Sequence, residues 1–434
     1  MCYFDFDSKI KQFGEVESAI SNIDETSGAV QDAQEKLVLG SEKVSAEEAP
    51  FVKIVNLILE EAIKEDSSDI HIEPSKNEVA VRIRIDGVLI KIMSPPINSL
   101  NGIVSRLKIL SKLDIAEKRL PQDGRMKIET SEREIDVRVS ILPTVHGEKV
   151  VLRLLGSGKL SLNLTNLGFP DKKLSVFKKW IKQPYGMIII SGPTGSGKST
   201  TLYAALKEIH SEGINITTVE DPVEYQLEGI NQVQMHEEIG LTFSGALRSI
   251  LRQDPDVLLI GEIRDEETAD IAVKFSLTGH LVFSTVHAND APSTIARLLD
   301  LGIPPFLLGS CLNLVMAQRL VRTVDKDSKE PYKPLDEDFN RLSFPKDKRN
   351  GEFYKGVPNQ SNHNTGYKGR TAIHEILEVN TDMKQLIFED ANQNQIKEAA
   401  KKAGMTTLRE AGIEKILDGK TDLNEVLRAT VEDS

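Results

Sequence analysis

Residues 192–199, GPTGSGKS, match the full pattern G-x-x-x-x-G-K-[ST] and lie between the apolar run MIII and the helix-like stretch TLYAALKEI. In such a loop, the glycines allow successive backbone N–H groups to turn toward phosphate oxygens at a helix N-terminus. We expect Lys198 to reach the β- and γ-phosphates, Ser199 to hold Mg²⁺ and Thr200 to start the helix. The alternative is a glycine-rich turn without a ligand. The predicted nucleotide-binding residues are Gly192, Pro193, Thr194, Gly195, Ser196, Gly197, Lys198, Ser199 and Thr200.

Hydrolysis also needs a carboxylate on the metal side and a group that positions water. Glu262 follows the apolar run VLLI, so it should emerge where that strand ends and is a candidate Walker B acid. Glu220, Asp221 and Glu224 cluster after the apolar run INITTV, and one of them could orient or deprotonate the attacking water. Surface acids after core strands are the structural alternative in both cases.

Two patterns contain histidines that could contact a metal ion or a phosphate. His280 and His287 flank an apolar run, and the alternation of side chains along a strand places them on opposite faces, so they should not share one metal. One could sense the γ-phosphate while the other packs, or both could be structural. Asp69, His71 and Glu73 share one strand face, but without a fourth ligand nearby we favour structural hydrogen bonding.

The elements that must position these residues follow from the apolar pattern. Between about residue 167 and residue 320, the runs MIII, INITTV, VLLI and LVFSTV alternate with helix-length stretches. This alternation predicts an α/β fold with a parallel sheet covered by helices on both faces. Earlier in the chain, DIHIEP and VAVRIRIDGVLI alternate polar and apolar residues, which indicates half-buried strands in a smaller α+β domain.

Shifts in composition suggest the domain boundaries. We expect a poorly packed N-terminal lead over residues 1–48, an α+β domain over 49–155, a linker over 156–170 and the nucleotide-binding domain over 171–434, with a polar insertion at 325–365 and a helical C-terminal part at 371–430.

Composition excludes several classes of protein. The net charge of -12 argues against a surface that neutralises many phosphates, so no direct contact with nucleic acid is expected. Only two cysteines occur, Cys2 and Cys311, which suits a reducing compartment rather than a disulfide framework. No apolar run reaches the roughly 18 residues of a membrane span, and no signal peptide is evident, so any membrane contact should go through a partner.

The order of motifs resembles the secretion-ATPase superfamily, in the branch of the type II secretion and type IV pilus assembly ATPases. The resemblance covers the chain from about residue 49 onward. The motifs that carry it are SDIHIEP, RIRIDGVL, RLPQDGR, DVRVSILPT, GEKVVLRLL, GPTGSGKST, TVEDPVEYQLEGINQVQ, LRQDPDVLLIGEIRD, TGHLVFSTVHANDA, AQRLVRT, TGYKGRTAIHEIL and GMTTLREAG.

The resemblance implies a RecA-like ATPase domain behind the smaller domain, ATP and Mg²⁺ as cofactors, and a homo-oligomer in the form of a hexameric ring. It implies a cytoplasmic motor, peripheral to the inner membrane, that acts on a platform protein in secretion or pilus assembly. A retraction motor, a competence DNA-uptake motor and an assembly scaffold with little turnover remain alternatives.

The resemblance also implies roles for individual residues. Glu224 takes the position of the water-activating glutamate, and His287 belongs to a histidine box near the γ-phosphate. Arginines of the smaller domain reach the nucleotide, at Arg125 and Arg138, with Arg119 as a further possibility. The implied catalytic residues are therefore Lys198, Glu224, Glu262, His287, Arg125 and Arg138, with Ser199 and Glu262 on the magnesium side.

Two departures from the family pattern produce further expectations. The 48 residues ahead of the matching region are too few for the extra docking domain of many members, which leaves the mode of docking open. The paired Cys-x-x-Cys zinc motif is missing, and its four positions align with Asp325, Ser328, Asn359 and Asn362. We therefore expect no structural zinc and a mobile protrusion in place of a packed knuckle.

Overall fold

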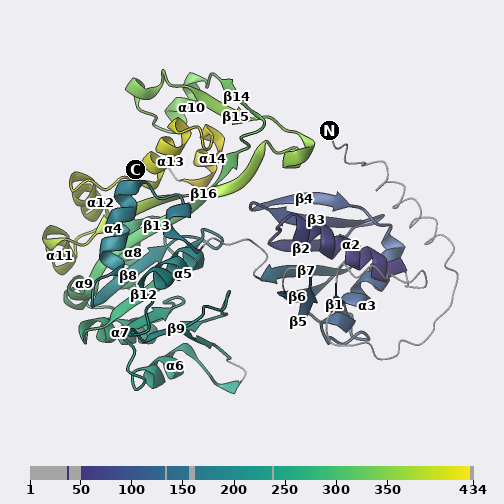
Figure 1. Cartoon of the computed structure of the whole chain (residues 1–434), viewed down its shortest axis with the longest axis horizontal. Coiled ribbons are helices and arrows are strands. Elements are labelled where there is room, and N and C mark those ends of the chain that lie inside the picture. The colour runs from purple at the N-terminus through teal and green to yellow at the C-terminus, as the bar shows by residue number, and fades with distance from the viewer. Residues whose placement is uncertain (1–36, 39–49, 132–133, 156–161, 237–238, 431–434) are drawn as a thin grey trace. The chain divides into compact units, whose positions relative to one another are not determined.

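The computed structural model describes residues 37–38, 50–131, 134–155, 162–236 and 239–430, and the chain divides into two compact units (Figure 1). The first unit ends at Lys159 and the second begins at Leu160. Of the expected linker, residues 156–161 lie outside the described residues, whereas Leu164 and Phe169 are buried in the second unit. Of the expected N-terminal lead, the structure describes Leu37–Val38.

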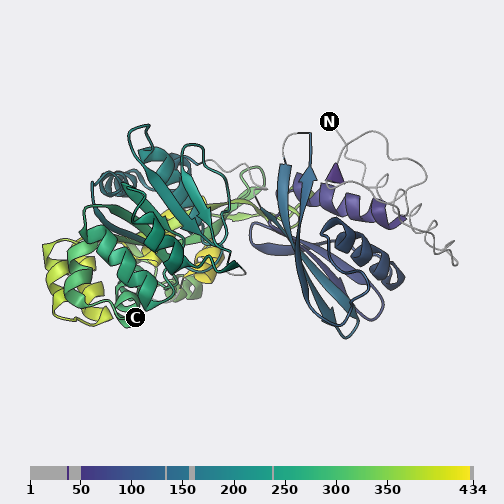
Figure 2. The same ribbon diagram turned by 90° about the horizontal axis from the view of Figure 1, so that it is seen from below.

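The first unit is an antiparallel sheet with helices on one face (Figure 2). Its alternating sequence divides the side chains between the two faces of the sheet. In β3, Val79, Val81 and Ile83 are buried on one face, and Arg82 and Arg84 lie on the other. Within the described residues the strand order is β1-β5-β6-β7-β2-β3-β4, with β1 parallel to β5. The elements are β1 (Leu37–Val38), α2 (Pro50–Lys64), β2 (Asp69–Pro74), β3 (Val79–Ile85), β4 (Val88–Met93), α3 (Leu100–Leu110), β5 (Gln122–Glu129), β6 (Glu134–Thr144) and β7 (Gly147–Leu155).

The second unit has a mostly parallel sheet, with the described strands in the order β10-β9-β11-β12-β8-β13-β16 and the last strand antiparallel. The four apolar runs of the sequence form β8, β9, β11 and β12, so the expected parallel α/β fold is confirmed. The strands are β8 (Gly186–Ser191), β9 (Ile216–Glu220), β10 (Asn231–Gln234), β11 (Val257–Ile260), β12 (Leu281–Val286), β13 (Leu312–Val324) and β16 (Tyr367–Glu378).

Helices cover both faces of this sheet, because its central strands are apolar on both sides. One hydrophobic cluster joins the sheet to α4 and α5, and a second joins the opposite face to the remaining helices of the unit. The helices are α4 (Asp171–Ile181), α5 (Lys198–Ile209), α6 (Phe243–Ile250), α7 (Glu266–Leu277), α8 (Ala291–Asp300), α9 (Pro305–Cys311), α10 (Asp336–Arg341), α11 (Thr381–Phe388), α12 (Gln393–Lys402), α13 (Leu408–Leu417) and α14 (Leu423–Ala429).

The polar insertion is packed, so the expectation that it lacks a packed knuckle is wrong, while its mobility stays a prediction. It contains a two-stranded antiparallel sheet, β14 (Lys329–Tyr332) and β15 (Phe353–Gly356), together with α10. Phe339, Phe344 and Phe353 are buried against one another, with ring centroids 5.1 to 5.7 Å apart. These rings belong to the main core of the unit. They are too far apart in the sequence to give a local periodicity, which is why the pattern missed them.

The four residues at the aligned zinc-ligand positions come together within this insertion. Asn362 Nδ2 donates to Asp325 Oδ2 and to Ser328 Oγ, each at 3.0 Å, and to the carbonyl of Val357 at 2.9 Å. Asn359 caps the same turn, because its side chain accepts the Asn362 N–H at 3.1 Å. Hydrogen bonds thus close this knuckle and satisfy its buried polar groups.

No group of three or more His, Cys, Asp or Glu side chains is arranged to hold a metal ion in the described parts of the chain. The absence of structural zinc stays a prediction.

Candidate active site

The phosphate-type loop, GPTGSGKS at residues 192–199, runs from the end of β8 into the first turn of α5, at the C-terminal edge of the parallel sheet. Gly192, Gly195 and Gly197 have φ values of 151°, 78° and 85°, a region that side chains with a Cβ avoid. A Cβ on Gly192 would lie 2.6 Å from the carbonyl oxygen of Gln318, so the loop also needs glycine for space. The backbone therefore makes the tight turn that brings successive N–H groups to a helix N-terminus.

Lys198 begins α5, two residues before the start expected at Thr200, because Gly197 takes the N-cap position in the left-handed conformation. Its ammonium donates to the carbonyls of Gly192 at 2.8 Å and Pro193 at 3.1 Å. Burial lowers the pKa of Lys198, and the Glu262 carboxylate partly opposes this shift. The ammonium is therefore held over the loop.

The other predicted loop residues differ in exposure. Pro193, Thr194 and Gly195 are exposed at the tip, Ser199 is exposed in the first helical turn, and Thr200 is half-buried. Ser196 is buried, and its hydroxyl has no hydrogen-bond partner among the described residues. Such a buried hydroxyl is suited to an incoming ligand oxygen.

Gln318, on the neighbouring strand β13, holds the loop in place by two hydrogen bonds. The sequence analysis did not identify it. Its Nε2 donates to the carbonyl of Ser196 at 2.8 Å, and its Oε1 accepts from the Thr201 hydroxyl at 2.9 Å. Gln318 lies 122 residues after Ser196 and 117 residues after Thr201, so no local pattern connects it to the loop. Its place in the motif AQRLVRT is the one signal in the sequence that could have identified it.

Glu262 and His287 meet at the same edge of the sheet. The last residues of β12 and β8, Val286 and Ser191, are register partners, so His287 and the loop leave adjacent strands at the same level. The Nε2 atom of His287 lies 3.3 Å from Glu262 Oε2, and Arg264 pairs with the other carboxylate oxygen. This arrangement brings an acid and an imidazole beside the phosphate-type loop.

His280 lies at the opposite end of β12, away from this edge. Its Nδ1 is 3.1 Å from both the Thr278 hydroxyl and the carbonyl of Phe275, and its ring packs on Phe275 with centroids 4.2 Å apart. Of the two histidines, His280 therefore packs in the fold and His287 faces the site.

The three acids of the turn after β9 lie in different surroundings. Glu220 is buried, and its Oε1 accepts from the Thr218 hydroxyl at 2.5 Å and from Gln232 Nε2 at 3.2 Å. Asp221 is exposed, and Glu224 is half-buried at the end of the turn. Glu220 is therefore held inside the fold, whereas Glu224 lies closer to the surface.

The predicted arginines lie in the first unit, on the sheet face that α2 and α3 leave open. Arg125 on β5 and Arg138 on β6 are direct cross-strand partners, and Arg138 is also the partner of Arg153 on β7. Arg119 lies ahead of these strands, is exposed and pairs with Glu117 at 2.7 Å. The first unit thus presents a row of guanidinium groups across neighbouring strands.

Asp69 and Glu73 are engaged in ion pairs on the same face. Asp69 pairs with Arg153 at 3.1 Å and Arg84 at 3.3 Å, and Glu73 pairs with Lys149 at 2.8 Å. These pairs favour the structural interpretation of the Asp-x-His-x-Glu pattern over a metal site.

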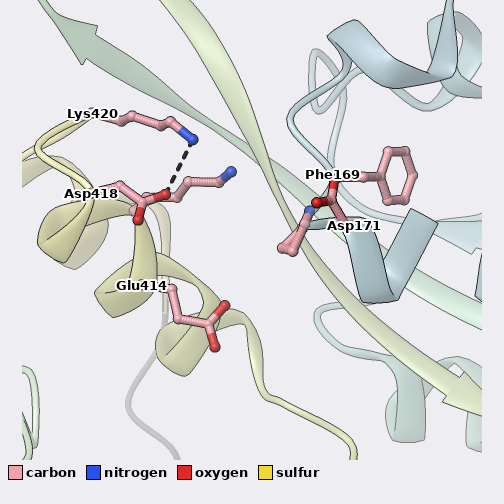
Figure 3. A pocket seen from close by; sticks show the side chains of 7 residues that line it. Phe169, Asp171, Glu414, Asp418 and Lys420 are labelled. Atoms are coloured by element: carbon pink, nitrogen blue, oxygen red, sulfur yellow. Dashed lines mark hydrogen bonds and ion pairs between the residues drawn. The ribbon is translucent and has the colours of Figure 1, made fainter. Parts of the chain in front are cut away.

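A cavity of about 370 Å³ lies elsewhere in the second unit, between the start of α4 and the end of α13 (Figure 3). Phe169, Asp171 and Glu414 line it, and a salt bridge of 3.1 Å joins Lys420 to Asp418 at its rim. None of its lining residues belongs to the phosphate-type loop, so it is separate from the site.

A glycine-rich loop at the C-terminal edge of a parallel sheet, with an acid and a histidine from adjoining strand ends, defines a P-loop ATPase of RecA-like fold. The chain belongs to the type II/IV secretion system protein family, whose model matches residues 44–428. No helix in the described part of the chain is both long and apolar enough to span a bilayer.

Characterised relatives match most of the chain. It is 51% identical to the type IV pilus assembly ATPase PilB of Myxococcus xanthus, over 90% of this chain and 69% of that protein. It is 45% identical to the type II secretion system protein E of Xanthomonas campestris pv. campestris, over 96% and 74%. The recognition of this branch from motifs is therefore confirmed.

Solved structures share the fold. The ATPase DotB of Legionella pneumophila has a TM-score of 0.63 at 19% identity, covering 91% of this chain and 98% of its own. The pilus retraction motor PilT with bound ADP has a TM-score of 0.59 at 24% identity, covering 87% and 97%.

Proposed function

We propose that this chain is the ATP-hydrolysing motor of a type II secretion or type IV pilus assembly machine. The observation that carries the proposal is the gathering of the loop after β8, Glu262 and His287 at one sheet edge. Relatives that are 45% and 51% identical and are named for these two machines support the choice of machine.

In this proposal the phosphates of ATP lie in the loop, where the N-terminus of α5 and the unpartnered Ser196 hydroxyl fit an anionic ligand. Lys198 contacts the β- and γ-phosphates. Ser199 and Glu262 supply the oxygen donors that Mg²⁺ prefers, and the ion would neutralise charge that develops on the phosphates.

The remaining groups act around the γ-phosphate. Glu224 holds the attacking water and accepts its proton, and Glu262 orients the His287 ring toward the phosphate by their contact. Arg125 and Arg138 complete the site from the first unit of the same chain or of a neighbour.

The proposed working form is a hexameric ring in the cytoplasm, attached to the inner membrane through a platform protein. ATP turnover moves that platform, which adds pilin-like subunits. No nucleic acid takes part, in keeping with the net charge of -12.

Phosphate release by purified protein, with and without Mg²⁺, tests the enzymatic part. Wild type should hydrolyse ATP, and Lys198→Ala should not. Binding of ATP without phosphate release would instead identify an assembly scaffold.

A gene deletion tests the machine. Loss of surface pili with normal secretion would identify pilus assembly, and loss of secreted proteins would identify type II secretion. A plasmid copy of the wild-type gene should restore the lost process, and a copy that encodes Lys198→Ala should not. A deletion that leaves both processes intact would contradict the proposal.

A further inference from the structure

Tyr203 is fully buried on α5, the helix that begins at Lys198. Its hydroxyl accepts the backbone N–H of Glu224 at 3.2 Å, and its ring packs edge-on against Tyr225 with centroids 6.2 Å apart. One side chain therefore connects the helix of the phosphate-type loop to the turn that carries Glu224.

Glu220 fixes the direction of that hydroxyl. Tyr203 donates its O–H to Glu220 Oε2, while Thr218 and Gln232 donate to Oε1. The amide nitrogen of Gln232 can only donate, so Glu220 acts as an acceptor in this network. With its proton directed at Glu220, Tyr203 turns a lone pair toward the N–H of Glu224.

Gln232 holds the far side of the same turn. Its Nε2 donates to the carbonyl of Tyr225 at 3.0 Å, and its Oε1 accepts the N–H of Leu227 at 2.6 Å. The turn is thus fixed at Glu224 and after it by one continuous network of buried and half-buried groups.

We propose that Tyr203, oriented by Glu220, is a positioning residue that sets the place of Glu224 relative to the phosphate-type loop. The inference rests on the proposed role of Glu224 in hydrolysis. Tyr203 touches neither substrate nor metal in this scheme; it acts through the backbone of Glu224.

Two further observations support the proposal. Tyr203 lies five residues after Lys198 on one continuous helix, so a shift of that helix moves both contacts together. Burial raises the pKa of Tyr203, and the adjacent Glu220 adds to the shift, which keeps the hydroxyl protonated throughout the physiological range.

The test compares Tyr203→Phe with Tyr367→Phe. Both variants lose one hydroxyl that donates to a buried carboxylate, but Tyr367 is half-buried and bonds to Asp422 on the α14 side of the unit. We expect Tyr203→Phe to lower kcat for ATP by about tenfold, because misplacement of a catalytic group slows the chemical step, while the Kd for ATP changes less than about twofold. Tyr367→Phe should keep the wild-type kcat.

The decisive measurement repeats Tyr203→Phe in a Glu224→Gln background. If Tyr203 acts through Glu224, its substitution causes no further loss of kcat there. An equal loss in both backgrounds would show a general structural effect and overturn the proposal, as would a wild-type kcat for Tyr203→Phe.

Glu220→Gln tests the same link without altering the tyrosine. Its amide can present an N–H to Tyr203 and turn the hydroxyl away from Glu224, so kcat should fall and the loss should again disappear with Glu224→Gln. If Glu224→Gln itself retains wild-type turnover, the proposed function of Glu224 fails. If only the Tyr203 and Glu220 variants retain it, this inference alone fails.

Discussion

The Nε2 atom of His287 lies 3.3 Å from a carboxylate oxygen of Glu262, although the two residues follow different strands. Their strands, β12 and β11, run in parallel with Ile260 opposite Ser284, which brings both side chains to one edge of the sheet. The orientation of each group therefore depends on the other.

This pair leads to a prediction about the two histidines. We expect His287→Asn to lower kcat for ATP by about tenfold or more, because the group beside Glu262 is lost, with little change in the melting temperature. His280→Asn should lower the melting temperature and leave kcat of the folded protein unchanged, since His280 packs on Phe275. Loss of kcat in both variants would contradict the different roles.

Lys198 and Glu224 should separate binding from chemistry. Lys198→Ala should lose ATP binding, because Lys198 is the cationic side chain that contacts the β- and γ-phosphates in the proposed scheme. Glu224→Gln should bind ATP normally and slow turnover by about 10²-fold or more. Binding of a fluorescent ATP analogue and phosphate release distinguish the two effects. Wild-type turnover by Glu224→Gln would show that another group activates water.

The arginine row predicts that activity depends on assembly. If Arg138 completes a neighbour's site, specific activity should rise with protein concentration, and Arg138→Ala should lower it by as much as about 10³-fold. Lys91→Ala is the matched control, because Lys91 lies on β4 in the same sheet and pairs with Glu78. Activity that is independent of concentration in a protein shown to be monomeric would count against the ring.

The hydrogen-bonded knuckle predicts that the protein folds without zinc. Elemental analysis of tag-free protein should find no stoichiometric zinc, and a chelator should leave it folded. Asn362→Ala should lower the free energy of unfolding by about 1–3 kcal/mol, because it removes hydrogen bonds to Asp325 and to the carbonyl of Val357 and leaves the single Ser328 hydroxyl as their shared side-chain donor. Asn350→Ala, at an exposed position, should have little effect. One tightly held zinc per chain would refute the prediction.

Glu425 predicts a specific loss of stability in acid. Burial alone would raise the pKa of this carboxyl, but hydrogen bonds from Arg322 and Arg428 outweigh it and lower the pKa from 4.5 to about 2. Because the folded pKa is depressed, the stabilisation is complete above the unfolded value and is lost as the pH falls from about 4.5 to about 2. The shift corresponds to about 3 kcal/mol.

Urea unfolding across this range should show that Glu425→Gln removes that pH dependence, whereas Glu352→Gln, at an exposed carboxyl, leaves it. Equal slopes for wild type and Glu425→Gln would contradict the assignment.

The sequence predicted the parts of the fold that local patterns determine. Apolar runs of strand length and the spacing of the glycines and Lys198 identified the central strands and the loop between them. Glu262 was found because a residue that follows a buried strand must emerge at its edge. These inferences need only neighbours in the chain.

Long-range contacts were not readable from the same patterns. Gln318 meets Ser196 across 122 residues, and nothing local marks it as a brace. Tyr203 has the spacing of an ordinary core residue of α5, so its bond to Glu224 appears only in three dimensions. The polar composition of the insertion predicted a mobile protrusion rather than a packed knuckle, whereas Asn362 is buried and hydrogen-bonded.

The knuckle formed by Asp325, Ser328, Asn359 and Asn362 has a consequence for life under oxidative stress. Peroxide and disulfide exchange attack thiolates, and none of these four side chains contains sulfur. Oxidants that would eject the ion from a four-cysteine knuckle have no target here. If the predicted absence of zinc holds, the region keeps its shape where reactive oxygen is abundant and where dissolved zinc is scarce.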